Sequence, residues 1–187
     1  QELAENRFAR AALARLLADD ELPLVYLTGP TGVGKSHLVR EAVVRWKSER
    51  PRDSVVQFDA ARYAADLADA SEAGEIPAFQ KRTRRADLFV IEDVHHLSGR
   101  VETQQQLLAT MNDVTAAGGR FVVTSLYAPG QLAAFDRRLV SRFRGGVMAS
   151  VSRPGVASRK ALLSHFAQCR KLAIAADVVE LVSGKVE

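Results

Sequence analysis

Short apolar runs, rich in β-branched and aromatic residues, recur along the chain and alternate with longer amphipathic stretches. Their length and composition are typical of buried strands. The hydrophobic pattern therefore predicts five strands. They are Leu24–Thr28, Val55–Phe58, Leu88–Ile91, Phe121–Thr124 and Val147–Val151.

Between these runs, apolar residues recur at the three- and four-residue spacing of an amphipathic helix. The clearest sets are Leu38, Val39, Ala42, Val43 and Trp46, then Leu107, Leu108, Met111 and Val114, and finally Leu162, Leu163 and Phe166. Strands that alternate with helices indicate a parallel sheet with helices on both faces. Pro154-Gly155 breaks the pattern, and only helical segments follow. We therefore expect an α/β domain over residues 1–153 and the start of a helical lid over residues 154–187.

Composition narrows the class of protein only slightly. The chain has 187 residues, of which 47% are hydrophobic and 26% charged, as in an ordinary globular domain with a small appendage. No apolar run approaches the roughly 20 residues that a membrane span needs. The single cysteine, Cys169, excludes an internal disulfide framework and is typical of the reducing cytoplasm. Because the chain begins at Gln1 without a signal segment, we expect it to be a piece of a longer protein.

Basic residues are clustered, although the net charge is only +4. The clusters are KRTRR at 81–85 and RRLVSRFR at 137–144. Clustered cations are better suited to recognising phosphates than a dispersed net charge. For the first cluster, a solvated helix face explains the pattern equally well.

A phosphate-binding loop is the strongest chemical signal. Residues 29–36 read GPTGVGKS, directly after the first strand and before a helical pattern, which is the context that this motif requires. Its glycines let the backbone wrap so that successive N–H groups and the next helix start point at phosphate oxygens. Lys35 supplies a cation for the β- and γ-phosphates, and Ser36 a hydroxyl for Mg²⁺. We expect a nucleoside triphosphate to be held by Gly29, Pro30, Thr31, Gly32, Val33, Gly34, Lys35, Ser36 and His37.

Two carboxylates follow the third strand, in the stretch LFVIEDVHHL. Ligands of a parallel sheet bind at the carboxyl ends of its strands, so we expect this strand to run beside the strand of the phosphate loop. Glu92 would then help Ser36 to hold Mg²⁺, partly through water, and Asp93 would orient the attacking water. His95 and His96 are adjacent and should face different ways, which favours ordinary residues at a helix start over a two-histidine metal site.

These motifs and the segments around them resemble the AAA+ ATPase domain of the DnaA family, the bacterial chromosomal replication initiators. ENRFARAA is similar to the family's stretch ahead of the phosphate loop. DLFVIEDVHHLSGRVETQQQLLATMNDV resembles its Walker B strand and the next helix, and FVVTSLYAP and DRRLVSRFRGG resemble its sensor 1 region and arginine-finger segment. The likeness runs from Asn6 almost to the end of the chain. It implies a P-loop AAA+ fold.

The interval between the second and third strands is unusually long. Residues 59–87 carry two helical patterns, one with Tyr63 and Leu67 and the other with Ile76 and Phe79, whereas a plain crossover needs only about a dozen residues. In the DnaA family, an extra helix pair here is the initiator-specific insertion, which assembles protomers and grips single-stranded DNA. The resemblance implies that basic residues on the second helix face DNA, namely Lys81, Arg82, Arg84 and Arg85.

The resemblance also assigns roles to the second basic cluster. Arg142, in SRF, matches the arginine finger that reaches the γ-phosphate held by a neighbouring protomer, and Arg138 matches a second arginine of that segment. A planar guanidinium binds phosphate oxygens in pairs, so a finger in trans would couple the nucleotide to assembly. An arginine-rich surface helix is the alternative.

Two positions depart from the family's pattern. Glu92 stands where the family usually has aspartate, and Leu126 stands at its polar sensor 1 position, with Thr124 or Ser125 left to substitute. We therefore expect secure binding of ATP or ADP and slow hydrolysis. The family's sensor 2 arginine and its DNA-reading helix-turn-helix would lie beyond Glu187.

The leading hypothesis is a weak ATPase that acts as a switch: a DnaA-like initiator, cytoplasmic and nucleoid-associated in a bacterium, that oligomerises on DNA in its ATP state to open the replication origin. Its expected partners are further copies of itself, single-stranded DNA, origin duplex through a C-terminal domain, and the replicative helicase. One alternative is a regulatory or helicase-loading relative that uses the same fold as an adaptor. Another is a metabolic P-loop kinase, which explains neither the finger-like arginines nor the insertion.

Overall fold

The computed structural model describes residues 3–18 and 21–185. Its centre is a five-stranded, wholly parallel sheet with the order β2-β3-β4-β1-β5. All five predicted strands are confirmed, each with ends within one residue of the expected ones. They are β1 (Leu24–Thr28), β2 (Val55–Asp59), β3 (Leu88–Glu92), β4 (Arg120–Ser125) and β5 (Val147–Ser150).

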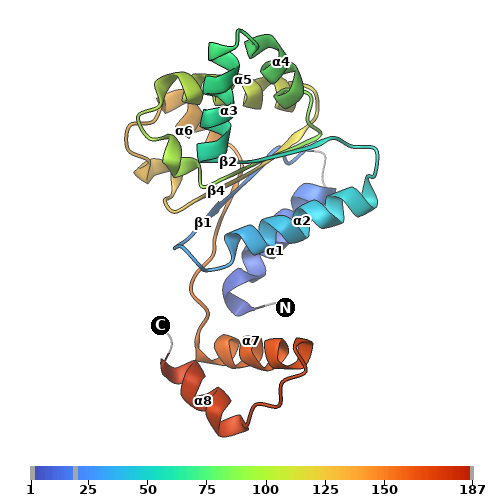
Figure 1. The fold of residues 1–187 in the computed structure, drawn as a ribbon, viewed down its shortest axis with the longest axis vertical. Helices are drawn as coiled ribbons and strands as arrows, with labels where there is room; N and C mark the ends of the chain where they lie inside the picture. The colour runs from blue at the N-terminus through green and yellow to red at the C-terminus, as the bar shows by residue number, and fades with distance from the viewer. Residues whose placement is uncertain (1–2, 19–20, 186–187) are drawn as a thin grey trace.

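Helices cover both faces of this sheet, as the alternating pattern predicts (Figure 1). One face carries α1 (Arg7–Ala18) and α2 (Lys35–Glu49). The other carries α3 (Ala60–Glu72), α4 (Ile76–Thr83), α5 (Val101–Ala116) and α6 (Arg137–Arg144). Single 3-10 turns, η1 (Ala4–Asn6), η2 (Val94–Leu97) and η3 (Pro129–Gln131), connect the larger elements.

Each central strand contributes side chains to two apolar cores. In β3, Leu88 and Val90 pack beneath α1 and α2, while Phe89 and Ile91 pack on the side of α3 and α5; all four are fully buried. This two-sided burial explains why the strands are apolar along their whole length and do not alternate.

The position of β3 differs from the expected one. The strand of the two acids does not run beside the strand of the phosphate loop, because β4 lies between them. The crossover through α2 carries the chain from β1 to β2 at the far edge of the sheet, and β3 and β4 then fill the gap. The apolar pattern predicts which segments are buried strands and contains no information about their order.

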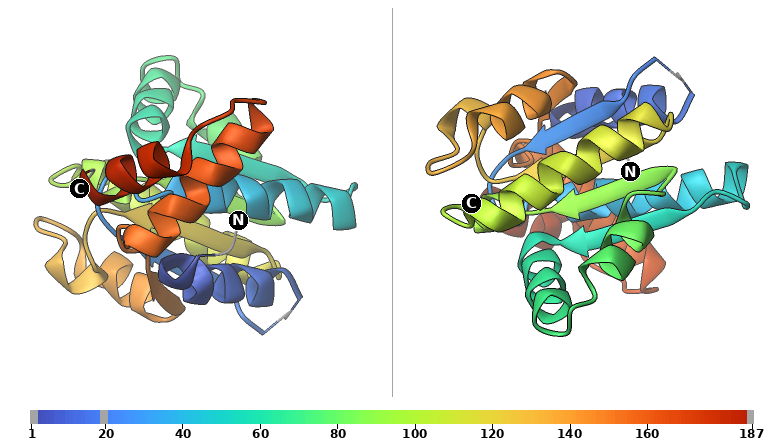
Figure 2. Two further views of the ribbon diagram at one scale, coloured as in Figure 1. Left: turned by 90° about the horizontal axis from the view of Figure 1, so that it is seen from below. Right: turned by 90° about the horizontal axis from the view of Figure 1, so that it is seen from above.

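Two further helices, α7 (Val156–Cys169) and α8 (Ala176–Lys185), pack on each other at the end of the chain. Figure 1 shows them apart from the layered sheet, joined to it by the extended segment after β5. The left view of Figure 2, from below, shows these two helices in front of the sheet and its helices. Helices thus follow Pro154 as predicted, and the subdomain boundary after residue 153 stays a prediction. Among the described residues, none of the helices combines the length and apolarity that a membrane crossing requires.

Candidate functional site

The phosphate loop turns sharply between β1 and α2. Gly32 and Gly34 have φ values of 82° and 101°, a region that favours glycine. Gly29 is needed for a different reason, because a Cβ at this position would lie 2.1 Å from the carbonyl oxygen of Val151. Its N–H donates to the Ser125 carbonyl at 3.3 Å, which ties the loop to the end of β4. The glycines thus allow the tight turn that the motif predicts, and their part in binding phosphate stays a prediction.

Lys35 begins α2 and is almost completely buried. Its ammonium group donates to the carbonyl oxygens of Gly29 at 2.7 Å and Pro30 at 3.0 Å. Burial lowers the pKa of Lys35, and the negative charges of Asp93 and Glu92 oppose that shift. The lysine is thus folded against its own loop, with both acids close enough to act on its charge.

The two acids stand at the turn after β3. Glu92 accepts a hydrogen bond through Oε1 from Gln57 Nε2 of the neighbouring strand β2 at 3.0 Å. Asp93 has the left-handed backbone angles φ 53° and ψ 46°, and its N–H donates to Thr124 Oγ1 at 2.9 Å. Thr124 thus fixes the backbone of Asp93 beside the loop, and the end of β4 connects the loop to the acids.

We expected the two adjacent histidines to face different ways, and the structure shows that they do not. Both lie in the tight turn η2, and their ring centroids are 4.3 Å apart. The Tyr127 ring meets His95 edge-on at 5.8 Å, and His95 Nδ1 accepts the N–H of Leu126 at 3.3 Å. Burial lowers the pKa of His95, and the nearby His96 lowers it further, so the ring is neutral at pH 7. The sequence does not predict the hydrogen bond between Leu126 and His95, because the two residues lie in separate turns of the chain.

A hollow of about 400 Å³ opens beside the loop, between α2 and the lid helix α7. Its walls are mainly apolar or ring-bearing and come from four parts of the chain. They include Leu3, Asn6, Val33, His37, Val151, Leu162, His165 and Phe166. A flat heterocycle attached to a phosphate chain would fit here. The helical spacing of Leu162 and Phe166 indicates an apolar helix face, and it does not show that this face lies over the phosphate loop.

The arginines of α6 lie at the other end of the sheet. Arg138 and Arg142 line a groove of about 530 Å³ with Leu24, at the start of β1, whereas the phosphate loop follows the end of that strand. A five-residue strand separates the two ends by roughly 13 Å. Arg142 is exposed, and the Arg138 guanidinium is paired with Asp136 at 2.9 Å. The structure thus places neither arginine at the chain's own loop.

The first basic cluster is divided between two environments. Helix α4 ends at Thr83, so the expectation that all of KRTRR lies on the second insertion helix is wrong. Arg82 approaches Asp66 of α3 at 3.5 Å and lies over the Phe79 ring, and Arg84 pairs with an acid of α5, Asp113, at 3.1 Å. The side chains of Lys81, Arg82 and Arg85 are exposed, and that of Arg84 is half-buried.

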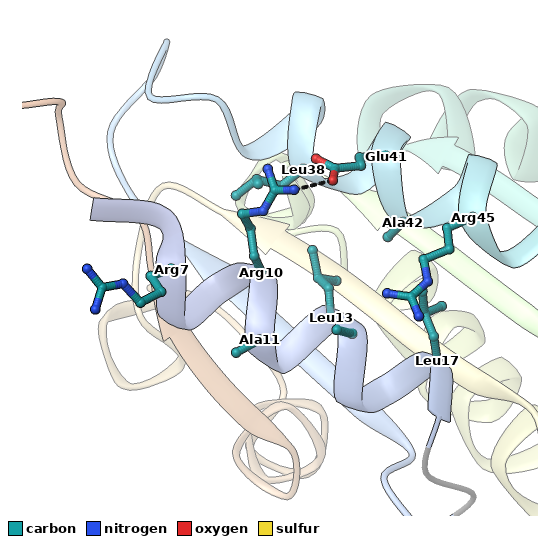
Figure 3. A pocket seen from close by; sticks show the side chains of 10 residues that line it. Arg7, Arg10, Ala11, Leu13, Leu17, Leu38, Glu41, Ala42 and Arg45 are labelled. Atoms are coloured by element: carbon teal, nitrogen blue, oxygen red, sulfur yellow. Dashed lines mark hydrogen bonds and ion pairs between the residues drawn. The ribbon is translucent and has the colours of Figure 1, made fainter. Parts of the chain in front are cut away.

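A further hollow, of about 280 Å³, lies between α1 and α2 (Figure 3). Figure 3 shows Arg10 and Glu41 pointing toward one another across it, and their Nη2 and Oε1 atoms are 2.5 Å apart. Arg45, on the same rim, pairs with Glu49 at 2.7 Å. These two cations of the hollow are thus engaged with acids of α2.

Known proteins resemble this chain in sequence and in fold. A family model described as the bacterial DnaA ATPase domain matches residues 2–150. The chromosomal replication initiator protein DnaA of Sphingopyxis alaskensis is 32% identical over 155 residues, which cover 81% of this chain and 34% of that protein. The chain thus spans about a third of the length of this curated relative.

Two solved structures share the fold closely. Domain III of the Thermotoga maritima replication initiation protein DnaA is 27% identical, with a TM-score of 0.91 over 96% of this chain and 76% of that one. A replication initiator DnaA bound to AMPPCP and single-stranded DNA is 23% identical, with a TM-score of 0.89 over 97% of this chain and 56% of that one. The strand order and the helices on both faces are therefore those of this group of structures.

Proposed function

Since the chain belongs to the DnaA family, we propose that it is the ATP-binding switch of a bacterial replication initiator, which binds ATP in the phosphate loop and then assembles on DNA. The observation that carries the proposal is the arrangement around Lys35. The loop, the two acids and the end of β4 meet there, and the hollow under α7 opens beside them. The activity of the whole initiator is part of the proposal, since the chain spans 34% of its curated relative.

The residues around the loop fit a nucleotide with its magnesium ion. Backbone N–H groups of the loop and the Lys35 ammonium would bind the phosphates, and the hollow under α7 would take the base. Mg²⁺ prefers oxygen ligands, which the Ser36 hydroxyl and the Glu92 carboxylate would supply. When bound, the ion neutralises charge on the β- and γ-phosphates. The solved relative that carries AMPPCP supports an adenine nucleotide as the ligand.

Hydrolysis in this proposal is slow, as suits a switch. Asp93 would orient the attacking water, with its backbone held by Thr124. Leu126 places an apolar side chain at the position where a polar group would help to align that water. Glu92 is also longer than aspartate by one methylene and shares a hydrogen bond with Gln57. Both features favour binding over rapid turnover.

In the assembly, the end of one copy that carries Arg142 would meet the phosphate-loop end of the next copy. Arg142 is exposed beside the start of β1, where it has no access to its own loop, and it would reach the γ-phosphate held by the next copy. Arg138 would support this surface through its pair with Asp136. Along such an assembly, the exposed Lys81 and Arg85 would meet single-stranded DNA, which the solved relative binds, through its phosphates. We place the protein in the bacterial cytoplasm, at the nucleoid.

Isothermal titration with ATP and ADP in the presence of magnesium tests the proposal. Lys35→Ala removes the buried cation of the loop, and loss of a hydrogen bond to a charged group typically weakens binding roughly tenfold or more. Arg40→Ala, at an exposed position of the same helix, is the matched control and should bind as the wild type does. Unchanged affinity in Lys35→Ala would sink the nucleotide assignment.

A further inference from the structure

Two hydrogen bonds of opposite direction join the turn after β3 to the end of β4. The Asp93 N–H donates to Thr124 Oγ1 at 2.9 Å, and the Leu126 N–H donates back to His95 Nδ1 at 3.3 Å. Between Thr124 and Leu126, the Ser125 carbonyl accepts the N–H of Gly29 at the start of the phosphate loop. His95 is thus part of the junction where the loop, the acids and β4 meet.

The hydrogen bond from Leu126 determines where the proton of the His95 ring lies. A ring nitrogen that accepts a hydrogen bond carries no proton, so the neutral imidazole of His95 carries its proton on Nε2. Nε2–H lies on the other side of the ring from Leu126, and none of the hydrogen bonds within the described part of the chain uses it. His95 therefore keeps one unused donor in the junction.

The ring is held in place by its neighbours. The His96 ring lies 4.3 Å away on one side, and Tyr127 meets His95 edge-on with an interplanar angle of 88°. The Tyr127 carbonyl in turn accepts the hydroxyl of Tyr26, from β1, at 2.8 Å. A donor fixed by packing and by a backbone hydrogen bond is preorganised for a ligand. Asp93, two residues before His95, and Gly29 of the phosphate loop both donate to the end of β4, so the ring lies at the same junction as the loop.

We propose that His95 takes the role of the polar side chain that is absent at position 126: its Nδ1 holds the Leu126 backbone, and its Nε2–H donates to the terminal phosphate of bound ATP. This inference rests on the proposed function, because it requires a triphosphate in the loop. It makes His95 a residue that distinguishes ATP from ADP. A change at the phosphate would reach the segment at Leu126 and Tyr127 directly through the ring.

Binding of ADP and of a non-hydrolysable ATP analogue to three variants tests the inference. His95→Phe keeps an aromatic ring against Tyr127 and removes both nitrogens, so the affinity for the ATP analogue should fall roughly tenfold or more, while that for ADP stays within about twofold. His95→Gln keeps one acceptor and one donor and should recover part of the loss. His96→Phe, the same substitution at the exposed neighbouring histidine, should leave both affinities unchanged.

Nitrogen NMR of the wild-type chain provides an independent measurement that does not depend on the folding of a variant. The His95 spectrum should show the Nε2–H tautomer, with an Nε2 resonance that shifts on addition of the ATP analogue and not of ADP. Equal losses for both nucleotides in His95→Phe, no loss at all, or the Nδ1–H tautomer would each overturn the inference. A wild-type chain that binds neither nucleotide would instead overturn the proposed function on which the inference rests.

Discussion

Asp93 has a backbone conformation that few residues tolerate, with φ 53° and ψ 46°. Asparagine adopts this left-handed region about as readily as aspartate, so Asp93→Asn removes the charge without straining the turn. We expect this variant to bind ATP as tightly as the wild type and to hydrolyse it roughly a hundredfold more slowly, because it cannot orient the water as a base. A phosphate-release assay beside a binding titration separates the two effects. Glu102→Gln, at an exposed position of α5, is the control.

The wild-type rate in the same assay is informative in itself. Turnover above about 1 s⁻¹, the low end of typical enzymes, would contradict the slow switch that we infer from Glu92 and Leu126. An Asp93→Asn variant with unimpaired turnover would remove Asp93 from the chemistry.

At individual positions, the conformation that a residue adopts is easier to predict from the sequence than the partners that it contacts. The turns at Gly32 and Gly34 follow from the motif, because local backbone geometry determines them, whereas the phosphate-binding role of Lys35 stays a prediction. The bond between Glu92 and Gln57 depends on which strands are neighbours, so no local pattern contains it. The contact of His95 with Leu126 likewise joins residues 31 positions apart.

The basic cluster of the insertion divides into two pairs, and we expect alanine substitutions in one pair to affect DNA binding and in the other to affect stability. Lys81 and Arg85 are exposed, so replacing both with alanine should lower the salt dependence of single-strand binding by roughly 0.7 per lost phosphate contact and leave the unfolding temperature unchanged. Arg82 and Arg84 are paired with Asp66 and an acid of α5, so replacing both should cost roughly 1 kcal/mol of folding stability. Fluorescence anisotropy with a labelled oligonucleotide and thermal melts measure the two effects.

An unchanged salt slope in the variant that lacks Lys81 and Arg85, in protein that still assembles with ATP, would show that the insertion does not grip DNA. The pair Arg82 and Arg84 serves as the matched control, because it removes the same charge from the same segment. If that control alone changed the slope, the internal ion pairs would have to open when DNA binds.

The apolar pattern predicts the buried and the half-exposed strands equally well. The apolar runs identify the strands to within one residue, whether or not a strand has a solvent-facing side. At β4 the run starts one residue too late, since the strand begins at the buried Arg120. Its guanidinium donates to the Leu16 carbonyl and lies 5.2 Å from the centre of the Trp46 ring. The order of the strands came only from the three-dimensional structure, because it depends on how the crossovers pack.

Across the whole molecule, the phosphate loop and the arginines of α6 lie at opposite ends of the sheet. We therefore expect Arg142→Ala to leave the ATP affinity of the monomer nearly intact and to abolish ATP-dependent assembly in a longer chain that includes the complete lid. Arg137→Ala, an exposed arginine lining the same groove, is the control for loss of charge alone. Titration of the monomer and light scattering of the longer chain are the measurements. A matching loss of affinity in the monomer would make Arg142 a ligand of its own loop.

Glu5 joins the N-terminal segment to α7 beside the hollow under that helix. Its carboxylate accepts the Gly155 N–H at 2.6 Å and the Ser158 hydroxyl at 2.7 Å, at the start of α7. These two bonds, the one from Gly155 first, lower the pKa of Glu5 from its ordinary value of 4.5. Because both η1 and α7 contribute to the walls of the hollow, the carboxylate holds these walls together.

The lowered pKa sets the sign of the pH dependence. An acid whose pKa is depressed in the folded state stabilises that state fully above its unfolded pKa. This stabilisation is lost as the pH falls through the lower folded pKa. We therefore expect Glu5→Ala to speed nucleotide release roughly three- to tenfold at pH 7 and to raise hydrogen exchange in α7. Wild-type release should approach that of the variant only below about pH 4.5, the ordinary pKa of glutamate. Glu72→Ala, at the exposed end of α3, is the matched control. If Glu5→Ala released nucleotide and exchanged amide hydrogens at the wild-type rates, the lid would stay on the hollow without this carboxylate.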